Sequence, residues 1–89
     1  MGPEREIEVA LLRRTRAAGG ECYKFESPGL AGMPDRLQLM PVAPEHQEIV
    51  ARYVRFIETK APGGKPRPLQ AERMKRLREL GFIAEVLDR

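Results

Sequence analysis

Two short segments carry acidic and basic side chains at spacings that suit chemistry on a phosphodiester. Asp35 follows Pro34 just before an apolar stretch, and Glu58 and Lys60 stand two residues apart in a segment rich in β-branched and aromatic residues. A strand places alternate side chains on one face, so Glu58 and Lys60 are expected to project together. An adjacent strand could bring Asp35 up to Glu58, which would gather two carboxylates and an ammonium.

This combination of side chains indicates a site for a hard divalent cation. Mg²⁺ takes oxygen ligands and keeps several waters, so Asp35 and Glu58 suit it, while Lys60 would hold a nucleophilic water or a phosphate oxygen. The strand face with Glu58 and Lys60 also carries Val54 and Phe56. A carboxylate that emerges from an apolar surface needs a partner or a metal. The sequence therefore predicts hydrolysis of phosphodiester bonds.

The residues around these positions resemble one nuclease family. Pro34-Asp35 followed by Glu58-Thr59-Lys60 is similar to the PD-(D/E)xK nuclease signature. Further motifs resemble the virus-type replication-repair nuclease (VRR-Nuc) domain, and they are Tyr23-Lys24-Phe25, Ser27-Pro28-Gly29, Gly32-Met33-Pro34-Asp35-Arg36, Glu58-Thr59-Lys60-Ala61-Pro62-Gly63, Pro66-Arg67-Pro68-Leu69-Gln70 and Leu80-Gly81-Phe82. The resemblance covers nearly the whole chain, so residues 1–89 are expected to form one VRR-Nuc domain of the stand-alone phage or bacterial type. The departure is the stretch 41–53, where stand-alone forms more often have a short hairpin.

The resemblance implies a metal-dependent endonuclease that cuts branched DNA, with resolution of Holliday (four-way) junctions as its activity. It implies Mg²⁺ or Mn²⁺ as the cofactor, with the ligands Asp35, Glu58, the backbone carbonyl of Thr59 and one glutamate of the first helix. Related nucleases carry such a glutamate, and either Glu8 or Glu4 matches the pattern, with a slight preference for Glu8. Lys60 and Gln70 complete the implied catalytic set. Stand-alone members of the family are dimers, so a homodimer is expected here.

The elements that must position these residues alternate between helices and strands. Periodicity and end signals predict helices over about 3–18 and 68–80, and strands over 21–25, 37–42, 49–60 and 82–87. The segment 49–60 is expected to be the central strand, and the crossover after it is long enough to make the last strand parallel to it. These elements predict an α/β fold with one mixed sheet flanked by helices in the order α-β-β-β-α-β. The resemblance implies that this single small domain is of the restriction-endonuclease type.

In each of the two predicted helices, the sequence allows two residues for one position of the core-facing side. In the first helix, either Arg14 or Thr15 continues the apolar face. In the second, the core face is expected to carry Leu69, Met74 or Arg73, Leu77 and Leu80. Gln70 falls in the first turn of that helix, where free amides favour an anion, so it could orient a phosphate or the attacking water.

Other basic and polar residues are candidates for contact with DNA, although a solvated surface explains each of them as well. They are Lys24 on the first strand, Ser27 in the following loop, Arg36 beside Asp35, the cations of the loop 61–68, and Arg73, Lys75, Arg76 and Arg78 on the second helix.

Length and composition set the limits for these interpretations. Eighty-nine residues with 42% hydrophobic content fit one domain with a small core, to which a subunit interface would add stability. There are two candidate interfaces, namely the apolar residues of the first helix and the stretch 41–53 with Ile49 and Val50.

A net charge of +3 fits a polyanionic partner. Cys22 is the only cysteine, which excludes an internal disulfide and a cysteine zinc site.

The sequence also bears on location and on the main alternative function. The chain has neither an apolar run of about 18 residues nor a signal-peptide core, so it is expected in the cytoplasm of a bacterium or a phage-infected host, without a membrane partner. The alternative to an enzyme is a catalytically silent nuclease fold that binds nucleic acid or a protein. The presence of the acids, Lys60 and Gln70 favours the enzyme.

Overall fold

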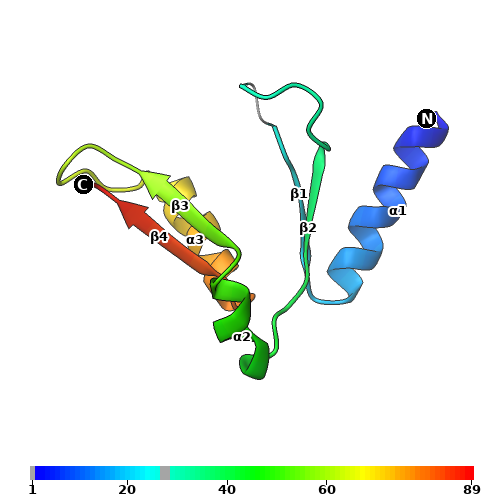
Figure 1. The fold of residues 1–89 in the computed structure, drawn as a ribbon. Coiled ribbons are helices and arrows are strands. Elements are labelled where there is room, and N and C mark those ends of the chain that lie inside the picture. The colour runs from blue at the N-terminus through cyan, green and yellow to red at the C-terminus, as the bar shows by residue number, and fades with distance from the viewer. Residues whose placement is uncertain (1, 27–28) are drawn as a thin grey trace. The chain divides into compact units, whose positions relative to one another are not determined.

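The computed structural model describes residues 2–26 and 29–89, which form two compact units (Figure 1). The first unit extends to Pro41 and contains α1 (Pro3–Ala17), β1 (Glu21–Lys24) and β2 (Arg36–Leu39). The second unit, Val42–Arg89, contains α2 (Pro44–Ala51), β3 (Arg55–Thr59), α3 (Pro68–Glu79) and β4 (Ile83–Leu87). The predicted α/β class is confirmed.

The first unit is a helix packed on an antiparallel hairpin. Pro3 begins α1, acidic residues lie in its first turn and Arg14 and Arg16 in its last, which is the charge order that the helix dipole favours. β1 pairs with β2 so that Glu21 faces Leu39. A Cβ on Gly20 would lie 2.4 Å from the backbone oxygen of Leu39, so only glycine fits where the chain enters the hairpin.

A buried polar contact joins α1 to the hairpin. Thr15 is 1% exposed, and its hydroxyl donates to the backbone oxygen of Leu11 at 2.7 Å. The same hydroxyl oxygen accepts a hydrogen bond from Gln38 Nε2 on β2 at 2.8 Å. The buried hydroxyl thus both donates and accepts a hydrogen bond, as burial of a polar group requires. Of the two residues that the sequence left open, Thr15 continues the inner face of α1.

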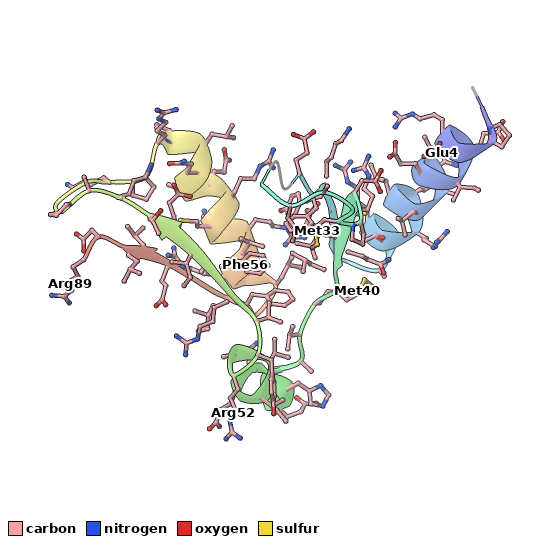
Figure 2. All side chains as sticks on the ribbon, turned by 45° about the horizontal axis from the view of Figure 1, so that its top comes forward. Glu4, Met33, Met40, Arg52, Phe56 and Arg89 are labelled. Carbon is pink, nitrogen blue, oxygen red and sulfur yellow. The ribbon has the colours of Figure 1, made fainter. Side chains whose placement is uncertain are left out.

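The second unit packs α3 on a pair of parallel strands, as predicted (Figure 1). Residues 55–59 of β3 run in register with residues 83–87 of β4. The buried apolar side chains of this unit are Met74, Leu77, Leu80 and Ala84. Phe56 on β3 (Figure 2) meets Phe82 edge to face, with 5.7 Å between the ring centroids. This small core holds the strand end that carries Glu58.

The predicted strand over 49–60 is wrong in its first half. The chain forms α2 over Pro44–Ala51, and β3 begins only at Arg55, so Val54 lies before the strand. Pro44 at the helix start and Glu45 in the first turn favour this helix, and its local hydrogen bonds override the strand preference of Ile49 and Val50. Among the described residues the element order is therefore α-β-β-α-β-α-β. Each unit contains one two-stranded sheet, antiparallel in the first unit and parallel in the second, where one mixed sheet was predicted.

The predicted core face of α3 is correct at Met74, Leu77 and Leu80 and wrong at its first member. Leu69 is 62% exposed, whereas Gln70 is half-buried on the side of Met74 and Leu77. The spacing of 70, 74 and 77 follows one face of the helix. Gln70 is therefore the first residue of the helix face that packs on the sheet, which brings it to Glu58.

None of the helices among the described residues is long and apolar enough to cross a membrane.

Candidate active site

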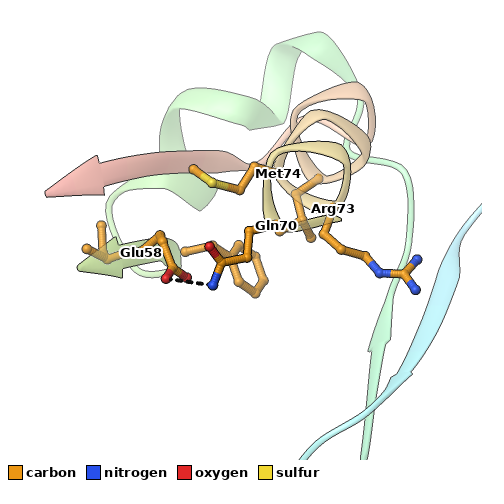
Figure 3. A pocket seen from close by; sticks show the side chains of 7 residues that line it. Glu58, Gln70, Arg73 and Met74 are labelled. Atoms are coloured by element: carbon orange, nitrogen blue, oxygen red, sulfur yellow. Dashed lines mark hydrogen bonds between the residues drawn. The ribbon is translucent and has the colours of Figure 1, made fainter. Parts of the chain in front are cut away.

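Glu58, Lys60 and Gln70 come together in the second unit. Lys60 Nζ lies 3.3 Å from Glu58 Oε1, so the two side chains project to the same side, as the strand spacing predicted. Gln70 Nε2 donates to the same oxygen at 3.0 Å (Figure 3). The side chains of Lys60 and Glu58 are 19% and 32% exposed, so both are partly shielded from water. The carboxylate is thus held by two donors at one oxygen.

The orientation of the Gln70 amide follows from its two contacts. Its Oε1 accepts the backbone N–H of Arg67, the residue that caps α3, at 2.9 Å. Its Nε2 then faces the Glu58 carboxylate. A flipped amide would set N–H against N–H and oxygen against oxygen, so one orientation satisfies both partners. Gln70 therefore links the start of α3 to Glu58, a role in addition to the water or phosphate contact that the sequence predicted.

A pocket of about 270 Å³ opens beside this group (Figure 3). Its lining is mostly apolar, and it consists of Phe56, Ile57, Glu58, Gln70, Arg73, Met74 and Leu77. The carboxylate of Glu58 and the amide of Gln70 are polar groups at an apolar wall. Such a concave site with a few convergent polar groups is the usual form of a ligand site.

The first unit brings the remaining predicted acids to one pocket. Asp35 shares a pocket of about 200 Å³ with Glu4, Glu8 and Arg36, over the apolar side chains of Ile7 and Leu11. Asp35 is exposed, and its backbone oxygen accepts the N–H of Phe25 at 2.8 Å, which holds the chain at this point. Glu4 lies in the first turn of α1 (Figure 2). Both glutamates that the sequence left open as ligands therefore lie near Asp35.

Glu8 differs from Glu4 in being held by two arginines. Arg36 on β2 donates to Glu8 Oε2 through Nε at 3.2 Å, and its Nη2 lies 3.0 Å from that oxygen. Arg5 binds Glu8 Oε1. The hydrogen bonds from Arg36 and then Arg5 lower the pKa of the Glu8 carboxyl. Sequence reasoning missed Arg5, although its spacing of three residues from Glu8 on a helix is a recognised pairing signal.

The other predicted site residues are spread over both units. Thr59 is exposed at the end of β3, and Lys24 is exposed at the end of β1, whereas Ser27 lies outside the described residues. Among residues 2–26 and 29–89, no three His, Cys, Asp or Glu side chains are grouped as metal ligands. Asp35 and Glu58 belong to different units, so their proximity stays a prediction. The donors themselves, carboxylate oxygens at the edges of pockets, are those that Mg²⁺ and Mn²⁺ prefer.

Comparison with known proteins supplies a relative along almost the full chain. The chain is 44% identical over 85 residues to a protein of Acyrthosiphon pisum secondary endosymbiont phage 1 named "Putative nuclease p44". The chain belongs to the p44 nuclease family. The match covers 96% of this chain and 82% of p44, so it includes residues of both units. No family model matches the chain, and no solved structure matches it.

Proposed function

We propose that this protein is a metal-dependent endodeoxyribonuclease of the VRR-Nuc type that hydrolyses phosphodiester bonds in branched DNA, with the four-way junction as its substrate. The observation that carries the proposal is the group formed by Glu58, Lys60 and Gln70 in a chain of the p44 family. A lysine and an oriented carboxylate at the rim of a pocket are suited to acting on a phosphate and a water.

The residues proposed as ligands of Mg²⁺ or Mn²⁺ are Asp35, Glu58, the backbone carbonyl of Thr59 and Glu4 or Glu8. Such a cation, when bound, lowers the pKa of a water and stabilises negative charge on the phosphate. Lys60 and Gln70 both contact Oε1 of Glu58, and no described residue donates to its Oε2. Gln70 and Lys60 therefore hold the carboxylate with one oxygen left for a ligand.

Besides contacting Glu58, the charged side chain of Lys60 would bind a water or a phosphate oxygen. Its ammonium has three donors, of which the contact with Glu58 uses one. The others would hold the nucleophilic water or a phosphate oxygen on which negative charge develops. Because Lys60 is largely shielded, that interaction is stronger than it would be in water.

A cleavage assay on a panel of DNA structures tests this function. The full chain is incubated with Mg²⁺, Mn²⁺ or EDTA and with end-labelled duplex, flap and four-way-junction DNA. We expect cleavage only with a divalent cation, with paired cuts in the junction, and loss of cleavage in a folded Glu58→Gln variant. Binding of DNA without cleavage under every condition would instead indicate a silent binding module.

We also propose that the active form is a homodimer. A four-way junction has approximate two-fold symmetry, so two sites related by a two-fold axis would give paired cuts. A candidate interface is the segment 41–53, where Ile49 and Tyr53 are 53% and 81% exposed. Light scattering over a concentration series should report twice the 10.1 kDa mass of the chain. A stable monomer that still makes paired cuts would contradict the dimer.

The two contacts of Gln70 predict that two substitutions will separate its roles. Gln70→Glu keeps an acceptor for the Arg67 N–H but puts a carboxylate against Glu58, whereas Gln70→Met loses both contacts. Cleavage should fall about 10- to 100-fold in both variants, as it does when a residue that orients a metal ligand is lost. Thermal unfolding should show a loss of about 1 kcal/mol from the missing cap in Gln70→Met. If Gln70→Met cleaved at the parent rate, the positioning role would be wrong.

A further inference from the structure

Arg36 is held by Glu8 in a manner that leaves half of its guanidinium open. Both contacts, from Nε at 3.2 Å and from Nη2 at 3.0 Å, go to the single oxygen Oε2 of Glu8. A guanidinium has five N–H donors, and this arrangement uses those on one edge. No described residue accepts a hydrogen bond from Nη1 of Arg36. The edge formed by Nη1 and the second N–H of Nη2 is therefore available to another oxyanion.

The position of this side chain is set by the backbone of β2 and by Glu8. Arg36 is the first residue of β2 and pairs with Lys24 of β1, so its backbone belongs to the hairpin. Its side chain is only 19% exposed, and the Glu8 that holds it is itself held by Arg5 on the same helix. Both Arg36 and Asp35 line the same pocket. The guanidinium is thus preorganised beside the acid on which the proposed chemistry depends.

We propose that Arg36 binds a phosphate of the DNA backbone beside Asp35, and that Glu8 is the positioning residue that orients it. The proposal rests on the proposed function, because it takes DNA as the substrate. An arginine with one edge on a carboxylate offers its other edge to two phosphate oxygens, a geometry that lysine cannot match. Both carboxylate oxygens of Glu8 are bound by arginines, so Glu8 orients Arg36. Glu4 is then the glutamate of this pocket that is available to a cation.

The test measures DNA binding in EDTA, where the proposed cleavage does not occur, at several salt concentrations. The variants are Arg36→Gln, Arg36→Lys and Glu8→Gln, with Arg55→Gln as the control that removes the same charge. Arg55 is exposed on β3 of the second unit and pairs with the exposed Glu85 at 3.5 Å. A second readout is Mn²⁺ binding by calorimetry without DNA, and thermal unfolding shows whether each variant is folded.

The expected results separate a phosphate contact from a metal ligand. Arg36→Gln should weaken DNA binding about tenfold and reduce the salt dependence by about one phosphate contact, and Arg55→Gln should leave both unchanged. Arg36→Lys should keep the salt dependence but bind more weakly than the parent, because it retains the charge and loses the fork. Glu8→Gln should weaken DNA binding while Mn²⁺ binding is preserved.

Two outcomes would overturn the inference. One is Arg36→Gln and Arg36→Lys both binding DNA as tightly as the parent, and the other is Glu8→Gln losing Mn²⁺ with unchanged affinity for DNA. If either outcome is observed while the parent protein cleaves DNA, the inference fails and the proposed function stands. A parent that neither binds nor cleaves any DNA of the panel overturns both.

Discussion

Replacement of Asp35 by alanine is expected to abolish cleavage and leave DNA binding intact. Asp35 is exposed at a pocket with Glu4 and Glu8, and among the described residues no side chain pairs with its carboxylate. An unpaired carboxylate in this position is suited to being a cation ligand. Its loss should remove several kcal/mol of transition-state stabilisation, which is about a thousandfold in rate.

The measurement compares cleavage and binding in the same preparation. Cleavage is followed with Mn²⁺ on a four-way junction, and affinity is measured in EDTA. Glu72→Ala is the matched control, because Glu72 is an exposed acid of α3 and its removal changes the net charge equally. Asp35→Ala should fold as the parent does, since the contact that holds this segment is made by the backbone oxygen of Asp35. Full activity in Asp35→Ala would remove this residue from the site.

Replacement of Lys60 by alanine is the second change with a large expected effect. Its ammonium lies 3.3 Å from Glu58 Oε1, and its backbone N–H donates to the oxygen of Leu87 at 3.0 Å. The backbone contact survives truncation, so the strand pair should persist in the variant. Loss of one positioned donor to a developing charge costs about 10²- to 10³-fold in rate.

Two further variants separate the charge of Lys60 from its shape. Lys60→Arg keeps the charge, but the larger and planar guanidinium would not reproduce the compact contact with Glu58, so activity should stay low. Arg89→Ala removes an exposed cation from the second unit and should leave the rate at saturating DNA unchanged. Rates are compared at saturating DNA so that binding does not contribute. Cleavage by Lys60→Ala at the parent rate would refute its role.

Local patterns in the sequence were enough to predict most of the elements and part of the site. The helices α1 and α3 and the parallel pair β3–β4 follow from periodicity, proline starts and crossover length. The shared face of Glu58 and Lys60 follows from the two-residue repeat of a strand. These features depend on residues that are close together in the chain, so they can be predicted directly from the sequence.

Competing local signals produced the errors. At 44–51 a proline start and an acidic first turn favour a helix, whereas Ile49 and Val50 favour a strand, and the sequence alone did not decide between them. Leu69 and Gln70 are neighbours at the start of α3, and hydrophobicity favoured Leu69 for the core. The structure turns Gln70 inward because its amide satisfies both the helix start and Glu58.

Contacts between distant residues were decided only by the tertiary structure. Arg36 and Glu8 are 28 residues apart and meet because α1 packs on the hairpin, where Thr15 also accepts a hydrogen bond from Gln38. The sequence allowed Arg36 either a carboxylate or a phosphate, and it left both Glu4 and Glu8 as candidate metal ligands, with a slight preference for Glu8. Packing distinguished the two glutamates, because side chains from different elements compete for the same charged groups only after the elements have assembled. The sequence thus gives the types of the side chains at the candidate site, whereas the folded chain decides which partners they contact.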